Sequence, residues 1–182
     1  VELIDDNGGN LRRIARRYAG EWGLGQGFMD WFEKHVHIAS TLVDRIVTGY
    51  PKDEIAAVGQ RLGYRDDLIV TSELFNLWVI EGDKAWSRVL PIHETDANVI
   101  WTEDVTPYKK RKVRILNGAH TSTVLAAYLA GYDTVGEFMK NDVSRKYMQT
   151  LIFTEIIPTL DLPRADLTAF AEAVTDRFEN PF

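Results

Sequence analysis

Residues 108–131 read YKKRKVRILNGAHTSTVLAAYLAG. Apolar residues recur at helical spacing along this stretch, and Gly131 is the residue type that commonly follows a last helical turn. Downstream, a capping box at Thr134 and a helix-ending proline at Pro158 mark further helices, and a final one is expected around residues 167–178. The second part of the chain is therefore predicted to be helical almost throughout.

The part of the chain before residue 108 mixes helices with short extended segments. Residues 1–4 read as the end of a strand, and residues 7–10, N-G-G-N, as a turn before a helix with apolar positions from Leu11 to Trp22. The predicted fold class is thus mainly α with a few short strands. Further strands are expected over 42–47, 68–71 and 77–80, and a helix over 51–63.

Gly23, Gly25 and Gly27 superficially resemble a dinucleotide-binding loop. Their spacing is not G-x-G-x-x-G, and the segment follows a helix instead of a strand. No nucleotide-binding role is therefore predicted for this loop.

The composition limits the classes of partner. The 182 residues carry a net charge of -6, and such an acidic balance argues against a nucleic-acid surface, which needs clustered cations. The chain has no cysteine, which excludes disulfides and thiolate zinc sites, and no apolar run approaches the roughly 20 residues that span a bilayer. We expect a cytoplasmic protein that binds a small molecule and neither nucleic acid nor membrane.

Lys112, Asn117 and His120 are polar residues on one side of the predicted helix. At about 100° per residue, Asn117 lies about 140° and His120 about 80° round the helix from Lys112. The helix is otherwise apolar on nearly every side, which is typical of a buried element, and buried polar groups need partners or a ligand. We therefore expect the three side chains to line one cavity.

Five of the six residues from Lys109 to Arg114 are basic. At the start of a helix expected from about Lys110, where the helix dipole is already positive, they do not favour stability. Such a cluster is expected to lower the pKa of a partly buried lysine, as a lysine general base requires, and to attract an anionic substrate.

Each of these features also has a purely structural interpretation. A basic run is usually a solvated charge patch, and a single histidine such as His120 is more often structural than catalytic. His35, His37 and His93 are not arranged with acidic residues at metal-ligand spacing, so no metal is predicted. What favours catalysis is the joint spacing of lysine, asparagine five residues later and histidine three after that.

This joint spacing resembles the catalytic motif of the long-chain mannitol dehydrogenase family, and RKVRILNGAHT is especially similar to its tagaturonate reductase (altronate oxidoreductase) branch. Several separated motifs in the family's order make the resemblance more specific than any one of them. These motifs are ELIDDNGGNL from Glu2, STLVDRIVTGYP from Ser40, WVIEG from Trp78 and NVIWTEDVTPY from Asn98.

The resemblance implies a role for each matching residue. Lys112 would act as general base, Asn117 would help to hold the developing alkoxide, and His120 would hydrogen-bond the reacting substrate. The remaining matches come from the earlier motifs: Asn7 as a second alkoxide-binding asparagine, Asp44 at the substrate site, and Arg45 and Asn10 as further substrate-binding candidates.

The resemblance also implies an NAD-dependent interconversion of D-altronate and D-tagaturonate. Residues 1–48 would be the tail of a Rossmann nucleotide-binding half, and residues 49–182 a helical substrate domain like the C-terminal domain of 6-phosphogluconate dehydrogenase. The family's glycine-rich turn and the C-terminal end of its substrate domain have no match in this sequence. The chain therefore reads as a fragment, with most cofactor contacts outside it.

Two alternatives stay open. Fructuronate reductase or mannitol dehydrogenase activity is one, because the catalytic trio does not distinguish substrates; the basic cluster favours a substrate with a carboxylate. The other is a helical interaction module without chemistry, in which Lys112 and His120 would be fully solvated.

Overall fold

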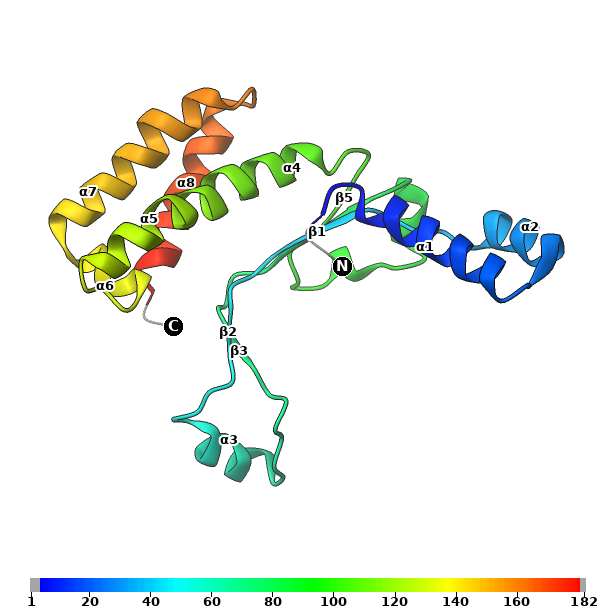
Figure 1. Ribbon diagram of the computed structural model, residues 1–182, viewed down its shortest axis with the longest axis horizontal. Helices are drawn as coiled ribbons and strands as arrows, with labels where there is room; N and C mark the ends of the chain where they lie inside the picture. Colours follow the sequence, from blue (N-terminus) through cyan, green and yellow to red (C-terminus); the bar gives the residue numbers. More distant parts are fainter. Residues whose placement is uncertain (1–3, 181–182) are drawn as a thin grey trace. The chain divides into compact units, whose positions relative to one another are not determined.

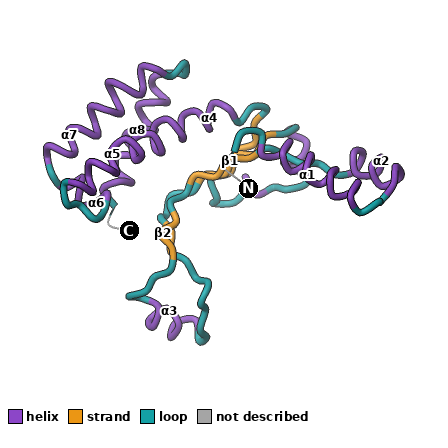
Figure 2. Tube along the Cα trace, viewed as in Figure 1, coloured by secondary structure: helices purple, strands orange, loops and turns teal. Residues whose placement is uncertain are grey.

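The computed structural model describes residues 4–180, so most of the extended start expected at residues 1–4 lies outside the described residues. Contacts divide the chain into two units, Val1–Val105 and Thr106–Phe182. The mainly helical character predicted from the sequence is confirmed, and the described strands all belong to the first unit (Figure 2). The division expected at residues 48 and 49 falls inside that unit.

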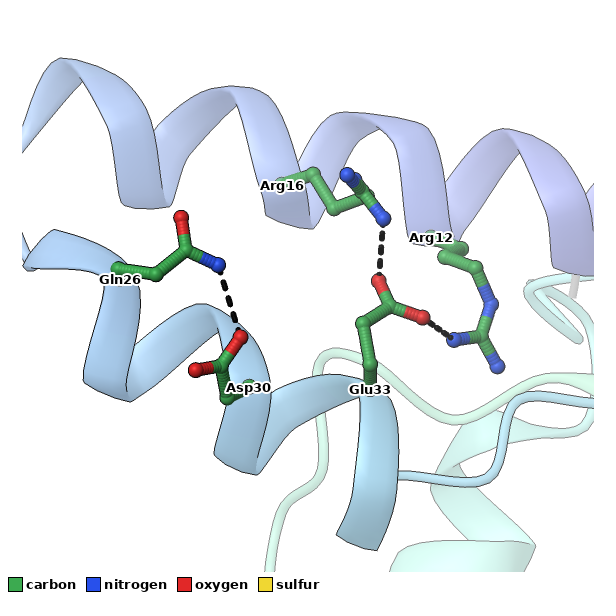
Figure 3. A network of polar contacts seen from close by, with 5 residues as sticks. All are labelled: Arg12, Arg16, Gln26, Asp30 and Glu33. Atoms are coloured by element: carbon green, nitrogen blue, oxygen red, sulfur yellow. Dashed lines mark hydrogen bonds and ion pairs between the residues drawn. The ribbon is translucent and has the colours of Figure 1, made fainter.

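Two helices, α1 (Asn7–Glu21) and α2 (Gly25–His35), begin the first unit. Glu33 of α2 accepts hydrogen bonds from Arg12 and Arg16 of α1 at 2.8 and 2.6 Å (Figure 3). Gly23, between the helices, and Gly25, the first residue of α2, adopt positive φ angles of 64° and 75°. This loop joins two helices, which fits a tight turn between helices and not the strand-to-helix turn of a dinucleotide site.

The turn predicted at residues 7–10 is wrong, because these residues form the first turn of α1. Asp6 is the N-cap: its backbone has a φ of 49°, and its carboxylate accepts a hydrogen bond from the Gly9 amide at 3.1 Å. A short polar side chain that tolerates this backbone conformation is a favourable N-cap. The turn therefore lies at Asp5 and Asp6, before the residues that the sequence suggested.

A three-stranded sheet follows, formed by β1 (Thr41–Asp44), β4 (Leu77–Glu81) and β5 (Val99–Thr102). β4 lies in the centre, antiparallel to β1 and parallel to β5. Asp44 pairs with Leu77, and Leu42 pairs with Val79. Since alternate residues of a strand point to opposite faces, Asp44 shares one face of the sheet with the buried residues Leu42 and Val79.

The segment between β1 and β4 is a short ribbon that leads to a helix. β2 (Val47–Gly49) pairs with β3 (Thr71–Ser72), and α3 (Ile55–Leu62) lies between them (Figure 1). The predicted helix start at Pro51 is therefore four residues too early, whereas its end at Gly63, with a φ of 77°, is confirmed. Two short 3-10 helices, η1 (Lys84–Arg88) and η2 (Ile92–Glu94), connect β4 to β5.

The second unit is a helical bundle (Figure 1). Its first part is one continuous helix, formed by α4 (Thr106–Arg111), the π-helical segment η3 (Lys112–Asn117) and α5 (Gly118–Leu129). The remaining elements are α6 (Val135–Lys140), α7 (Asp142–Thr150), a second π-helical segment η4 (Leu151–Ile156), η5 (Ile157–Thr159) and α8 (Arg164–Glu179).

Local signals predicted much of this bundle. The capping box of Thr134 and Glu137 is confirmed, and Gly131 has the positive φ, 87°, expected after a helix. The core consists of apolar side chains from η3, α5, α6, α7, η4, η5 and α8, among them Ile115, Met139 and Val174, each with no exposed surface. No helix among the described residues is long and apolar enough to cross a membrane.

Candidate active site

Lys112 and Asn117 are the first and last residues of the π-helical segment η3. In an α-helix a residue five positions on lies about 140° away, but a π-helix closes its hydrogen bonds between residues five apart. The wider turn therefore brings Asn117 nearly above Lys112 on one face. Asn117 and His120 are three residues apart, which makes them neighbours on the helix surface.

The side chain of Asn117 makes no hydrogen bond with any described residue. Its Oδ1 atom is buried and unpartnered, while its Nδ2 atom is not enclosed. A buried polar atom without a partner is destabilising, and such atoms in native proteins are rare. The amide of Asn117 therefore has unused hydrogen-bonding capacity on the face that it shares with Lys112.

His120 is exposed, and the expectation of a wholly buried helix is wrong for its second half. Ile115, Leu116 and Ala119 are buried, but farther along α5 large apolar side chains face solvent. These are Val124, Leu125, Tyr128 and Leu129, which are 42%, 75%, 72% and 85% exposed. Lys112 is half-buried at the start of the buried part.

The basic cluster does not lie at a helix start, as the sequence suggested. α4 begins at Thr106, three residues before Lys109. Lys112 therefore lies inside a continuous helix, at the junction of α4 and η3. Because the dipole effect is confined to the first and last turns, it does not act strongly on Lys112. Lys110 and Arg114 of this cluster are exposed, whereas Arg111 is half-buried.

Asn7 fixes the start of α1 to β1. Its Nδ2 donates to the Thr41 carbonyl at 2.7 Å, and its Oδ1 accepts from the Thr41 amide at 2.9 Å. Gly8 follows with its Cα so close to the segment before β1 that an added Cβ would lie 2.6 Å from the Ser40 nitrogen. The asparagine predicted to bind the alkoxide is thus also a bidentate link between two elements.

Asn10 is engaged inside the same turn. Its Nδ2 donates to the carbonyls of Asp5 and Asp6, both at 2.9 Å, and its Oδ1 accepts from Arg13. These contacts stabilise the beginning of α1.

Asp44 ends β1 and is 1% exposed. Its neighbour Arg45 directs Nε and Nη2 to the Glu73 carbonyl, at 3.0 and 2.9 Å. The carboxylate of Glu73, itself 6% exposed, accepts from the Ile46 amide at 2.6 Å. Glu73, which the sequence did not single out, therefore holds the chain directly after Asp44.

On the other face of this sheet, Trp78 and Trp101 line a cavity of about 410 Å³ together with Trp86. Neither Asn7 nor Asp44 lines that cavity.

Among residues 4–180, no group of three histidine or acidic side chains is placed to hold a metal ion. The structure thus places the predicted residues in two groups, each described within its own unit: Asn7, Asn10, Asp44 and Arg45 in the first, and Lys112, Asn117 and His120 in the second.

Two family models match the chain: the mannitol dehydrogenase Rossmann domain over residues 1–94 and the mannitol dehydrogenase C-terminal domain over residues 104–182. The chain belongs to the mannitol dehydrogenase family. The resemblance seen in the sequence motifs is thereby confirmed.

Within this family, the chain is similar to curated proteins named altronate oxidoreductase. Those of Shigella flexneri and Escherichia coli O6:K15:H31 are each 50% identical over 181 residues, covering the whole chain. The chain spans 38% of the length of these relatives.

Two solved structures share the fold. The Pseudomonas fluorescens mannitol 2-dehydrogenase, in a ternary complex with NAD and D-mannitol, matches with a TM-score of 0.63 and 32% identity, over 83% of this chain and 30% of that one. A substrate-free D-sorbitol dehydrogenase matches with a TM-score of 0.65 and 25% identity, over 83% and 31%.

Proposed function

We propose that this chain carries the proton-transferring residues of an NAD-dependent dehydrogenase that interconverts D-altronate and D-tagaturonate. The observation that carries the proposal is the π-helical turn, which places Lys112 and an unpartnered Asn117 amide on one face. The 50% identity to altronate oxidoreductases supports the choice of substrate.

The proposed reaction assigns a step to each of these residues. In oxidation, the neutral Nζ of Lys112 accepts the proton of the substrate hydroxyl as hydride leaves the carbon that bears this hydroxyl. Asn117 donates from Nδ2 to the oxygen as its negative charge develops, and the preorganised donor lowers the barrier. His120 adds a hydrogen bond to the substrate, and in reduction Lys112 returns the proton to the oxygen.

When bound, NAD accepts the hydride in oxidation and returns it in reduction. Lys112 and Asn117 fit the substrate side of that reaction, because Asn117 offers an unused amide donor on the face of Lys112. Gly23 and Gly25 join two helices, so we assign no contact with the dinucleotide phosphates to them.

Oxidation of a polyol is the second candidate function, favoured by the mannitol 2-dehydrogenase and D-sorbitol dehydrogenase structures that share the fold. The same Lys112 and Asn117 chemistry serves a neutral substrate equally well. Turnover of D-altronate, D-mannitol and D-sorbitol at equal concentration distinguishes the two candidates.

The test of Lys112 uses a chimera in which this chain replaces the matching 181 residues of an Escherichia coli altronate oxidoreductase. Arginine keeps the positive charge but does not deprotonate at ordinary pH, so Lys112→Arg separates proton transfer from charge. Both Lys112→Ala and Lys112→Arg should lose about 10²- to 10⁴-fold in kcat, which is the usual contribution of general acid-base catalysis. A small added amine should restore part of the rate of the alanine variant.

The matched control is Lys110→Arg, since Lys110 is an exposed member of the same basic run. It should keep the rate of the unmodified chimera. If Lys112→Arg oxidised altronate at that rate between pH 7 and 10, Lys112 would not be the base.

A further inference from the structure

Arg111 precedes Lys112 and contacts two aromatic rings. Its guanidinium carbon lies 4.5 Å from the ring centre of Phe170 in α8 and 5.6 Å from that of Tyr108 in α4. Arginine stacks well on aromatic faces, and the contact fixes a side chain that otherwise has many rotamers. Phe170 is 9% exposed and belongs to the core of the second unit, so the support is rigid.

The guanidinium of Arg111 has no hydrogen bond and no ion pair with any described residue. Its Nε atom is buried without a partner, whereas its two terminal nitrogens are not enclosed. An arginine has five N–H donors in a planar fork that matches a carboxylate with two parallel hydrogen bonds. The two terminal nitrogens of Arg111 are therefore fixed in position, and their N–H donors are unused.

Other half-buried arginines of the chain differ in this respect. Arg12 is paired with Glu33 at 2.8 Å. Arg145 donates from Nε to the Met139 carbonyl at 2.9 Å and lies 3.4 Å from Glu179. An arginine that serves only to join two elements uses its donors within the fold, as these do, but Arg111 does not.

We propose that Arg111 is the specificity-determining residue that binds the carboxylate of the sugar-acid substrate. The inference rests on the proposed function, because the carboxylate must reach Arg111 while the reacting hydroxyl is at Lys112, the next residue. Two charge-assisted hydrogen bonds from Nη1 and Nη2 would fix the acid end of the substrate. A neutral polyol or ketose has no group that satisfies this fork.

The kinetic test compares D-tagaturonate with D-tagatose, its neutral counterpart, in the chimera defined above. Arg111→Gln should raise KM for tagaturonate by about 10- to 100-fold with little change in kcat, because the contact binds ground state and transition state alike. The kinetic constants for tagatose should change less than about 3-fold. Arg111→Lys should recover only part of the tagaturonate affinity, since lysine is a point charge and not a fork.

Arg114→Gln is the matched control for charge. Arg114 is exposed and lies three residues farther along the same basic run, so this variant removes one positive charge without touching the stacked fork. It should keep the preference for tagaturonate over tagatose within about 3-fold. Equal loss in Arg111→Gln and Arg114→Gln, or equal loss for both substrates, would overturn the role of Arg111 while leaving the proposed reaction intact.

A second measurement decides the question without turnover. In the 182-residue chain, the Nε–H resonance of Arg111, identified by its absence in Arg111→Lys, should shift on titration with tagaturonate and not with tagatose. A chimera without turnover of either substrate would count against the proposed function. The titration would still test whether Arg111 binds the carboxylate. The absence of a shift at saturating tagaturonate would overturn the carboxylate site.

Discussion

Asn7 and Asn117 both belong to motifs that resemble the family, yet the helical turns in which they lie use their side-chain amides differently. The amide of Asn7 is engaged on both atoms by the Thr41 backbone, which fastens α1 to β1. The amide of Asn117 has no hydrogen-bond partner among the described residues, and its oxygen is buried. The Asn7 amide thus stabilises the fold, whereas the Asn117 amide keeps unused hydrogen-bonding capacity.

The difference shows which observation separates a functional amide from a structural one. Both residues belong to motifs that resemble the same family, and both are half-buried. Only the hydrogen-bond partners distinguish them, because a buried polar group that stabilises the fold has its partner within the fold. Replacing the two asparagines should therefore affect different properties.

The largest effect is expected for Asn117→Ala. In the chimera, kcat should fall by about 10²- to 10³-fold, the usual cost of losing one donor to a developing oxyanion. The free energy of unfolding of the chain should change by less than about 1 kcal/mol, because the variant breaks no hydrogen bond within the fold. Steady-state kinetics and urea unfolding measure the two quantities. A stable variant with unchanged kcat would remove Asn117 from the proposed site.

Features of the fold that depend on neighbouring residues could be predicted from the sequence. The capping box at Thr134 and the helix end at Gly131 are examples, since each depends only on residues within one turn. β5 was missed because its four residues form a strand only through pairing with β4, more than 15 residues earlier. Asp6 was missed as the N-cap because the glycines after it suggested a turn.

The candidate site could be predicted in composition but not in geometry. The spacing of Lys112, Asn117 and His120 identified the residues, but α-helical periodicity put the first two about 140° apart. Periodicity cannot reveal a π-helical turn, which widens the helix by one residue without any marker in the sequence. The free fork of Arg111 was equally hidden, because it depends on Phe170, nearly 60 residues away along the chain.

Gly8→Ala should destabilise the first unit by about 3 kcal/mol, the upper end of the usual cost of overpacking. The new Cβ would lie 2.6 to 2.8 Å from backbone atoms of Ala39 and Ser40, which cannot turn aside as a side chain can, so overpacking is severe. Urea unfolding followed by tryptophan fluorescence reports on this unit alone, because all five tryptophans lie within it.

The control for Gly8 is Gly20→Ala in the same helix, where an added Cβ meets nothing within 4 Å. This variant should be more stable than the unmodified chain by about 0.5 to 1 kcal/mol, because alanine favours the helix. Similar midpoints for the two variants would mean that the close approach of Gly8 to Ala39 and Ser40 does not exclude a side chain at position 8.

Asn7→Ala should have a smaller effect on stability, about 2 kcal/mol, because it removes two hydrogen bonds that each contribute about 0.5 to 1.5 kcal/mol. The Thr41 amide and carbonyl lose their partners, so the cost falls on the fold, unlike that of Asn117→Ala. Asn10→Ala is the matched control, since its contacts stay within residues 5–13, and it should cost less than about 1 kcal/mol. If Asn7→Ala unfolded at the same urea concentration as the unmodified chain while its chimera lost turnover, Asn7 would resemble Asn117. The distinction between Asn7 as a structural residue and Asn117 as a substrate-binding residue would then fail.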